Sequence, residues 1–250
     1  MVWQPGTAKA LKRSLDIYYR DRGRTARMDA MNARFVSPGD LVFDIGAHVG
    51  DRTASYRRLG AKVVTVEPQA SMYRFLRMFF GRDPQIHLVN AALGAEQGET
   101  TLYLNSANPT TSTAARAMVE AAPDAVAWAD QVWDDETTVI VMTLDQLIAA
   151  HGRPDFVKID VEGYEAKALQ GLSHPLPSLS FEFTTLQRDV AIDALDILDR
   201  LGRYRFAYSL GESHVMAQND WISATEMKDV IGTLPVEANS GDIYARLSNT

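Results

Sequence analysis

The stretch Leu-Val-Phe-Asp-Ile-Gly-Ala-His-Val-Gly, residues 41–50, decides the fold of this chain. Its apolar first half predicts a buried β-strand, Gly46 and Gly50 predict a tight turn, and the helical pattern that begins at Asp51 predicts a helix. Ligands bind at the carboxyl ends of the strands in open parallel sheets. Glycine leaves room there for a ligand to approach the backbone. The stretch therefore predicts an α/β domain with a ligand site beside this turn.

Strand and helix patterns alternate on the carboxyl side of this stretch. Strands are predicted at 41–45, 62–66, 85–89, 156–161, 179–183, 204–210 and 243–247, and helices at 51–59, 71–80, 144–150, 164–169 and 191–201. Such alternation predicts a mostly parallel sheet with helices on both faces. Two further strands, at 100–104 and 138–142, are expected to be antiparallel.

The remaining segments divide the chain. Residues 1–36 are predicted to be an N-terminal helical extension, and residues 37–250 the main domain. Residues 105–137 are too long for an ordinary connection and predict an insertion over the site. This insertion opens with polar residues and continues as an alanine-rich, acidic helix or pair of helices. Residues 211–240 are predicted to be a loop.

Composition limits the classes of function. The chain has 250 residues, a formal net charge of −7 and no cysteine, which excludes disulfides, thiolate metal sites and cysteine nucleophiles. The acidic balance disfavours nucleic acid as a partner. No apolar leader or membrane-length apolar run is present, so we expect a cytoplasmic protein without membrane insertion.

Charge is distributed unevenly, since residues 1–34 hold eight basic and three acidic side chains. Basic amphipathic helices can attract an acidic partner or a membrane surface. We favour a solvated helix pair that caps the fold, or a subunit contact. A homo-oligomer therefore stays open.

Two acidic residues follow predicted strands and point to a cationic, nucleoside-containing cofactor. Asp44 belongs to the pattern Asp-x-Gly-x-x-x-Gly, which differs from the phosphate-binding G-x-G-x-x-G. Its negative charge would repel a phosphate but suits the ammonium and sulfonium groups of S-adenosylmethionine. Glu67 ends the next strand, 21 residues after Gly46. A carboxylate at that position is expected to accept hydrogen bonds from both ribose hydroxyls.

The run Val-Asn-Ala-Ala-Leu-Gly, residues 89–94, ends the third strand. Its position predicts a place beside the adenine ring, where Asn90 or a backbone group near Ala91 reads the amino edge. The alternative is that Asn90 only caps a turn.

The run Phe-Val-Lys-Ile-Asp-Val-Glu-Gly-Tyr-Glu, residues 156–165, places Lys158, Asp160 and Glu162 around a strand end. These side chains could bind substrate, bind a metal or accept a proton. Lys158 and Asp160 share one side of the strand, so a structural ion pair is the simpler account. His48 is the best-placed histidine, and it either orients a ligand or merely packs.

Taken together these runs resemble the FkbM family of S-adenosylmethionine-dependent methyltransferases. The matching pieces are FDIGAHVGDRT, VVTVEPQ, VNAALG, MTLDQL, VKIDVEGYEAKALQG, the late SFEF strand and the ending GDIYARL. The resemblance covers roughly residues 38–185. It implies a class I methyltransferase (Rossmann-like) fold with a seven-stranded, mostly parallel sheet and an antiparallel last strand. It also implies methyl transfer, usually to a hydroxyl of a sugar, polyketide or related small metabolite.

The resemblance also implies site residues. Asp44, Gly46 and Gly50 would line the methionine end, Glu67 would hold the ribose and Asp160 would close the site. Position within the motifs adds Ala47, His48, Pro68, Asn90 and Ala91 to the predicted cofactor-binding set, and it makes Asp160, Glu162, Lys158 and His48 the catalytic candidates. Family members often carry a histidine soon after the acid of the fifth strand, but Glu182-Phe183-Thr184-Thr185 has none. A divalent metal at Asp160 and Glu182 is allowed but not favoured, because no third ligand is evident. No metal ligand is therefore assigned.

Two other functions compete with this one. A nicotinamide-dependent Rossmann oxidoreductase shares the fold and the ribose acid, but it predicts G-x-G-x-x-G, which this sequence lacks. A catalytically inactive methyltransferase-fold interaction module is the second alternative. The intact Asp44, Gly46 and Glu67 favour retained cofactor binding.

Overall fold

The computed structural model describes residues 5–125 and 128–248 of the chain. Within them a seven-stranded sheet has the order β3-β2-β1-β7-β8-β10-β9. Its strands are β1 (Leu41–Ile45), β2 (Lys62–Val66), β3 (Ile86–Val89), β7 (Phe156–Ile159), β8 (Ser178–Thr184), β9 (Tyr204–Leu210) and β10 (Ser240–Leu247). The last strand, β10, is antiparallel to both β8 and β9, whereas the pairs from β3 to β8 are parallel. This confirms the predicted sheet.

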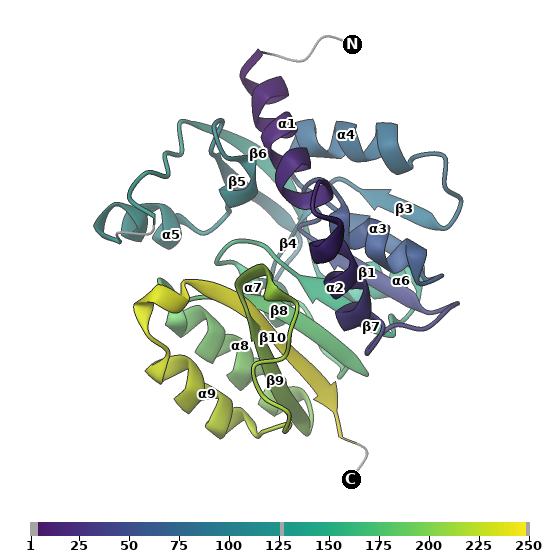
Figure 1. Ribbon diagram of the computed structural model, residues 1–250, viewed down its shortest axis with the longest axis vertical. Helices are drawn as coiled ribbons and strands as arrows, with labels where there is room; N and C mark the ends of the chain where they lie inside the picture. The colour runs from purple at the N-terminus through teal and green to yellow at the C-terminus, as the bar shows by residue number, and fades with distance from the viewer. Residues whose placement is uncertain (1–4, 126–127, 249–250) are drawn as a thin grey trace.

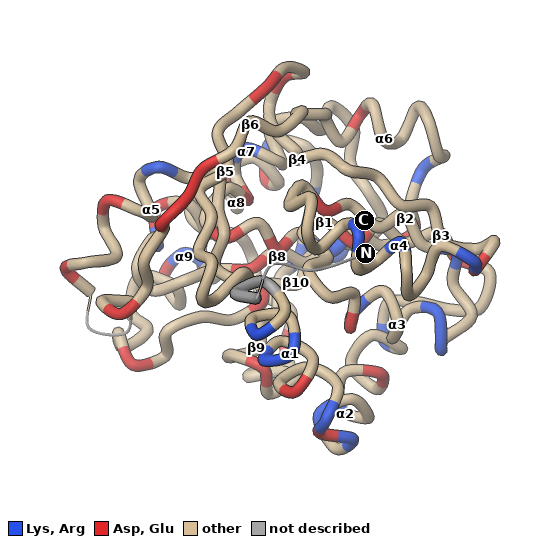
Figure 2. Tube along the Cα trace, turned by 90° about the horizontal axis from the view of Figure 1, so that it is seen from above, with Lys and Arg blue, Asp and Glu red and all other residues tan. Residues whose placement is uncertain are grey.

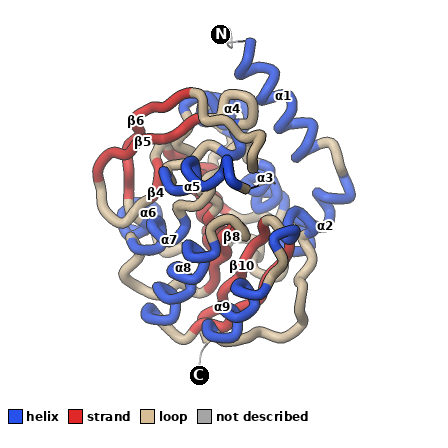
Figure 3. Tube along the Cα trace, turned by 90° about the vertical axis from the view of Figure 1, so that its left-hand side faces the viewer, coloured by secondary structure: helices blue, strands red, loops and turns tan. Residues whose placement is uncertain are grey.

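Helices cover both faces of this sheet (Figures 1 and 3). They are α1 (Pro5–Tyr19), α2 (Arg22–Asn32), α3 (Asp51–Arg58), α4 (Ala70–Phe80), α6 (Leu144–His151), α7 (Glu165–Gln170), α8 (Arg188–Leu201) and α9 (Ala224–Thr233). Successive strand residues point to opposite faces. Val42 accordingly packs in a core with Tyr56 of α3, while Phe43 joins the larger core that includes Leu195 of α8. Burial on both faces explains why these strands are continuous apolar runs.

A smaller sheet has the order β4-β6-β5 and lies beside the main one. It comprises β4 (Ala92–Leu93), β5 (Gly98–Leu104) and β6 (Asp135–Met142), and the connection from β5 to β6 holds η1 (Pro109–Thr111), α5 (Arg116–Ala121) and η2 (Ala122–Asp124). β5 and β6 pair antiparallel, as expected from the sequence. The predicted helical part of the insertion is short, and its residues 126–127 lie outside the described residues.

The prediction of a loop over residues 211–240 is wrong. This segment contains η3 (Gly211–Ser213), α9 and η4 (Val236–Ala238). Ser223 and Glu226 form a reciprocal capping box at the start of α9, and Met227 and Ile231 are buried on one side of it. A capping box ahead of apolar residues four apart is a readable helix signal.

The two N-terminal helices are docked on the main domain. The hydroxyl of Tyr19 donates to the carbonyl of Val49 at 2.9 Å, and the amide of Asn32 donates to the hydroxyl of Ser55. The domain boundary at residue 36 stays a prediction. In the described part of the chain no helix is long and apolar enough to cross a membrane.

Candidate functional site

The carboxyl ends of β1, β2 and β7 meet at one edge of the sheet. Their last residues are paired in register, so the residues that follow directly, Gly46, Glu67 and Asp160, lie close together. Parallel pairing alone therefore gathers three of the predicted site residues. They come from separate motifs but share one location.

Gly46 is required by the close approach of two loops. Its φ is +79°, and a Cβ there would lie 1.7 Å from the carbonyl oxygen of Asp160. Gly50 has a φ of +73°, and a Cβ there would meet Leu76 and Phe80 at 2.8 and 2.5 Å. Gly50 therefore makes room for α4, and its predicted contact with the cofactor stays a prediction.

The Glu67 carboxylate is held by two backbone amides. One oxygen accepts from the amide of His48 at 2.8 Å, and the other accepts from the amide of Gln69 at 2.7 Å. Burial raises the pKa of Glu67 to about 7. Asn90 supports this turn from outside, because its amide donates to the carbonyls of Glu67 and Pro68 at 2.8 and 3.1 Å. Asn90 thus braces the turn that carries Glu67.

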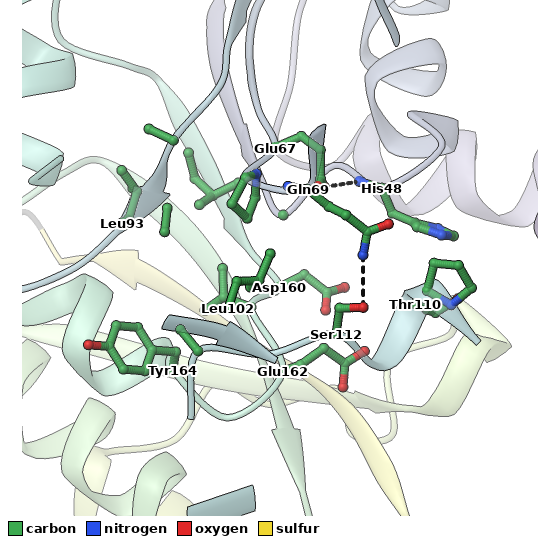
Figure 4. A pocket seen from close by; sticks show the side chains of 18 residues that line it. His48, Glu67, Gln69, Leu93, Leu102, Thr110, Ser112, Asp160, Glu162 and Tyr164 are labelled. Atoms are coloured by element: carbon green, nitrogen blue, oxygen red, sulfur yellow. Dashed lines mark hydrogen bonds between the residues drawn. The ribbon is translucent and has the colours of Figure 1, made fainter. Parts of the chain in front are cut away.

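An apolar pocket begins at Glu67 and extends to Leu93, Leu102 and Tyr164 (Figure 4). The insertion forms one wall of it, where the amide of Gln69 donates to the hydroxyl of Ser112 at 2.8 Å. Its lining residues are Ile45, Gly46, His48, Glu67, Pro68, Gln69, Ala91, Ala92, Leu93, Leu102, Pro109, Thr110, Ser112, Ala114, Asp160, Val161, Glu162 and Tyr164. The predicted cofactor contacts that line this pocket are Gly46, His48, Glu67, Pro68, Ala91 and Asp160.

A polar pocket adjoins the apolar one. It is lined by Tyr18, Arg24, Asp44, Gly46, Ala47, His48, Asp51, Arg52, Thr110, Lys158, Asp160, Glu162 and Glu212, so Gly46, His48, Thr110, Asp160 and Glu162 belong to both. Asp44 is buried in its wall, where it accepts a hydrogen bond from the hydroxyl of Thr53. Burial raises the pKa of Asp44 to about 6.

Lys158 is the centre of a buried ion-pair group. Its Nζ lies 2.6 Å from Oδ1 of Asp242 and 3.2 Å from Oδ2 of Asp160. Burial alone would lower the pKa of this ammonium, but Asp160 and Asp242 outweigh burial and hold the pKa above its usual range. A permanently charged ammonium is a poor proton acceptor. The geometry therefore favours Lys158 as the residue that positions Asp160.

Three carboxylates converge beside Lys158. One ligand oxygen each of Asp160, Glu162 and Glu182 lie within 4.8 Å of one another. Glu162 is 9% exposed, and burial together with the nearby Asp160 raises its pKa. In the described part of the chain, one oxygen of Glu182 is buried without a hydrogen-bond partner. Such a cluster holds a shared proton or a cation. Glu162 thus supplies a third carboxylate beside Asp160 and Glu182, a grouping that was not evident from the sequence.

The loop that carries Glu162 is held in an unusual backbone conformation. Glu162 has a φ of +54° and is followed by Gly163 at +89°. Glu165, at the start of α7, accepts hydrogen bonds from the amides of Val161 and Gly163 at 3.1 and 3.2 Å. Glu165 therefore has a structural role, and it fixes Glu162 at the edge of both pockets.

His48 is half-buried and also has a positive φ, of 48°. Its Nε2 lies 3.4 Å from the hydroxyl of Ser14, and its ring meets the ring of Tyr18 edge-on at 5.8 Å. Burial lowers the pKa of His48 to about 4. The imidazole is therefore neutral near pH 7 and can accept or donate a hydrogen bond in either pocket.

The sequence analysis did not predict several residues in and around the polar pocket. Arg24 of α2 donates to Asp51 at 2.9 Å and also to Glu212 of η3, and both acids line the polar pocket. These residues are distant along the chain, so no local pattern joins them. Asp242 gave a weak signal, because a charge in the strand pattern Gly-Asp-Ile-Tyr-Ala needs a buried partner.

Comparisons with known proteins point to a methyltransferase family. The model of the family described as the methyltransferase FkbM domain matches residues 44–208. No curated protein matches the chain. Among solved structures, precorrin-6y C5,15-methyltransferase from Geobacter metallireducens GS-15 is 14% identical, with 90% of this chain and 87% of that chain covered and a TM-score of 0.44. A TehB-like SAM-dependent methyltransferase from Corynebacterium glutamicum ATCC 13032 Kitasato is 13% identical, with 95% and 94% covered and a TM-score of 0.47.

Proposed function

The chain belongs to the FkbM methyltransferase family, and from this we propose that it uses S-adenosylmethionine to methylate a hydroxyl group of a small metabolite such as a sugar or polyketide. The observation that carries the proposal is the position of Glu67. Its carboxylate lies at the rim of an apolar pocket that opens into a polar pocket lined with acids. A nucleoside fits the first, and a cationic group fits the second.

The residues present fit this cofactor on grounds of shape and charge. Gly46 allows the loop that carries Asp160 to come close to the end of β1, where a Cβ would meet the carbonyl oxygen of Asp160. Glu67 would hold the ribose hydroxyls, and the apolar wall that includes Ala91 and Leu93 would receive the adenine ring. Asp44 and Asp160 lie on the polar side, where negative charge would attract the ammonium and sulfonium groups.

When bound, S-adenosylmethionine supplies an electrophilic methyl group. The chain's contribution is then to hold the acceptor oxygen in line with that group, since proximity and orientation can lower a barrier by about 7–11 kcal/mol. The polar pocket suits such an acceptor because its arginines and carboxylates can hydrogen-bond neighbouring hydroxyl groups.

The acceptor hydroxyl must lose its proton, and Glu162 is the best-placed acceptor of that proton. It lines both pockets, and its raised pKa brings its proton affinity closer to that of a useful general base. Asp160 is less suited because Lys158 holds its carboxylate. His48 is the second candidate, since it is neutral and lies in both pockets.

Cofactor binding is tested first, by calorimetry with S-adenosylhomocysteine and by thermal shift in parallel with NADH. We expect saturable binding of S-adenosylhomocysteine and no shift with NADH. Stabilisation by NADH alone would favour the oxidoreductase instead. Binding without any methylated product from a broad acceptor screen would favour the inactive interaction module.

The catalytic assignment is tested once an acceptor is found. Glu162→Gln keeps the shape of the side chain but removes its basicity, and general-base catalysis is worth about 10²–10⁴-fold. We expect kcat to fall by that order with S-adenosylhomocysteine affinity retained. Glu99→Gln, on an exposed residue of β5, is the matched control. Full turnover in Glu162→Gln, and also in His48→Ala, would make the assignment wrong.

A further inference from the structure

Helices α1 and α4 pack side by side and form one continuous outer face (Figure 1). Leu11 of α1 packs in one apolar cluster with Met72 and Phe75 of α4. The ring of Tyr19, at the end of α1, lies 6.5 Å from the ring of Phe79 on α4. The inner sides of the two helices are therefore joined, and their outer sides face solvent together.

The outer face is strongly basic. Residues 8–20 and 70–82 hold seven Lys and Arg side chains and one acid, Asp16. The seven are Lys9, Lys12, Arg13, Arg20, Arg74, Arg77 and Arg82, and all are exposed. Over residues 5–125 and 128–248, none of the seven forms an ion pair. Figure 2 shows basic segments along α1. The face is thus opposite in sign to the chain, whose net charge is −7.

Large apolar side chains are exposed among these cations. Ile17 of α1 is 48% exposed, and Met78 and Phe79 of α4 are 66% and 62% exposed. Cations alone would be explained as a solvated surface. Exposed aliphatic and aromatic groups between unpaired cations are the pattern of a helix face that lies in a lipid interface.

We propose that this α1–α4 face binds the surface of an anionic lipid membrane. The cations would lie at the lipid headgroups, and Ile17, Met78 and Phe79 would enter the boundary with the acyl chains. A second copy of the chain is disfavoured as the occupant, because a symmetric contact would bring like charges together. Nucleic acid would pair with the cations but would leave the aliphatic groups Ile17 and Met78 exposed.

Docking in this orientation has a consequence for the site. Tyr18, on the inner side of α1, lines the polar pocket. A membrane on the outer side of α1 would therefore bring that pocket close to the headgroups. This favours an acceptor that resides at a membrane surface. That inference about the acceptor rests on the proposed methyl transfer, whereas the membrane docking itself is independent of it.

The test is co-sedimentation of the full chain with vesicles of phosphatidylcholine, with and without phosphatidylserine, in the absence of cofactor. We expect binding to the anionic vesicles only, and weaker binding as salt is raised. The variant Lys9→Gln/Lys12→Gln/Arg13→Gln should bind about a hundredfold more weakly, from the usual contribution of a basic residue at such a surface. Ile17→Ser/Met78→Ser should also bind more weakly while keeping the salt dependence.

The matched control is Lys167→Gln/Arg200→Gln/Arg203→Gln, which removes the same charge from exposed positions in α7, in α8 and after α8. It should bind as the unchanged chain does. Equal loss in both triple variants would overturn the proposal, because net charge rather than this face would be responsible. Failure to bind anionic vesicles, preference for an oligonucleotide of equal charge, or self-association through these residues would overturn it as well. Because no cofactor is present, these outcomes are distinct from failure of the methyltransferase assignment.

Discussion

The apolar and polar pockets share a wall but are built in different ways. The apolar pocket is formed mainly by residues from five short runs of sequence, each at a strand end or in the insertion. The polar pocket combines α1, α2, η3 and the strand ends, and its residues span positions 18 to 212. A pocket lined from a few local motifs can thus be read from the sequence, whereas a pocket lined by distant segments depends on how those segments pack.

The two pockets also differ in how their charged side chains are held in place. Backbone amides hold Glu67 in the apolar pocket. The polar pocket has five acids and three basic side chains in its lining, and most of them are paired with one another. Backbone amides carry no charge and stay in place when a nearby side chain is substituted, while an ion-pair network loses its balance when one member changes. We therefore expect the polar pocket to tolerate substitution less well.

The largest effect is expected for Gly46→Ala, which breaks the edge that both pockets share. The new Cβ would meet the carbonyl oxygen of Asp160 at 1.7 Å, and alanine is strained at a φ of +79°. Strain and overpacking together should lower the free energy of unfolding by about 2–5 kcal/mol and abolish binding of S-adenosylhomocysteine. Thermal unfolding and calorimetry measure the two effects.

Gly39→Ala is the matched control, because Gly39 has a φ of +94° with nothing within 4 Å of a Cβ. It should cost about 1–2 kcal/mol from strain alone and leave ligand binding intact. Equal losses in the two variants would mean that the contact with Asp160 is unimportant.

A smaller effect is expected for Glu67→Ala, which alters the apolar pocket alone. Loss of the predicted ribose hydrogen bonds should weaken binding of S-adenosylhomocysteine by about 1.5–3 kcal/mol. Calorimetry measures the change, and Glu99→Ala on the exposed side of β5 serves as the control. Unchanged affinity in Glu67→Ala would place the ribose elsewhere.

A pH dependence should separate Glu67 from the polar pocket. The pKa of Glu67 is raised to about 7 by burial, so the free protein takes up a proton below that pH. A ribose that donates to the carboxylate binds the ionised form, so affinity should fall by up to about tenfold per unit as pH falls below 7. In Glu67→Gln this slope should disappear. A slope that survives the substitution would belong to the acids of the polar pocket.

The same raised pKa affects the stability of the free protein in the opposite direction. The folded chain holds the Glu67 proton at pH values where the unfolded chain has released it. The contribution of Glu67 to stability is therefore present at low pH and is lost as pH rises from its ordinary pKa towards 7. The difference in unfolding free energy between the unchanged chain and Glu67→Gln should follow that trend.

The smallest effect is expected for removal of divalent metal. Asp160, Glu162 and Glu182 are close enough to hold an ion, but Lys158 already offsets part of their charge and raised pKa values allow a proton to be shared. Turnover with an identified acceptor should survive exhaustive EDTA treatment. Complete loss of turnover with EDTA, restored by Mg²⁺ in the unchanged chain but not in Glu182→Gln, would show that the cluster is a metal site.

The sequence predicted the fold because strand and helix patterns are local. The seven-stranded, mostly parallel sheet and the antiparallel last strand are both confirmed. The motifs around Gly46, Glu67 and Asp160 were readable for the same reason, since each lies directly after an apolar strand. The helix over Ala224–Thr233 was not predicted, although Ser223 and Glu226 form a capping box that marks its start.

The polar pocket could not be predicted in the same way. Arg24 and Glu212 meet only after the N-terminal helices dock and η3 folds against them. Glu182 joins Glu162 only because β8 follows β7 in the sheet order. Contacts of this kind depend on tertiary packing between segments that carry no shared pattern.

The shared wall of the two pockets makes their occupants thermodynamically linked. His48, Asp160 and Glu162 line both pockets, so a ligand in one pocket that moves any of these side chains changes the other pocket as well. If a bound cofactor changes the affinity for the acceptor by some factor, a bound acceptor must change the affinity for the cofactor by the same factor. The demethylated product of the cofactor lacks the sulfonium charge, so it applies a different factor. Under the proposed methyl transfer, release of the two products would therefore be coupled through these three side chains.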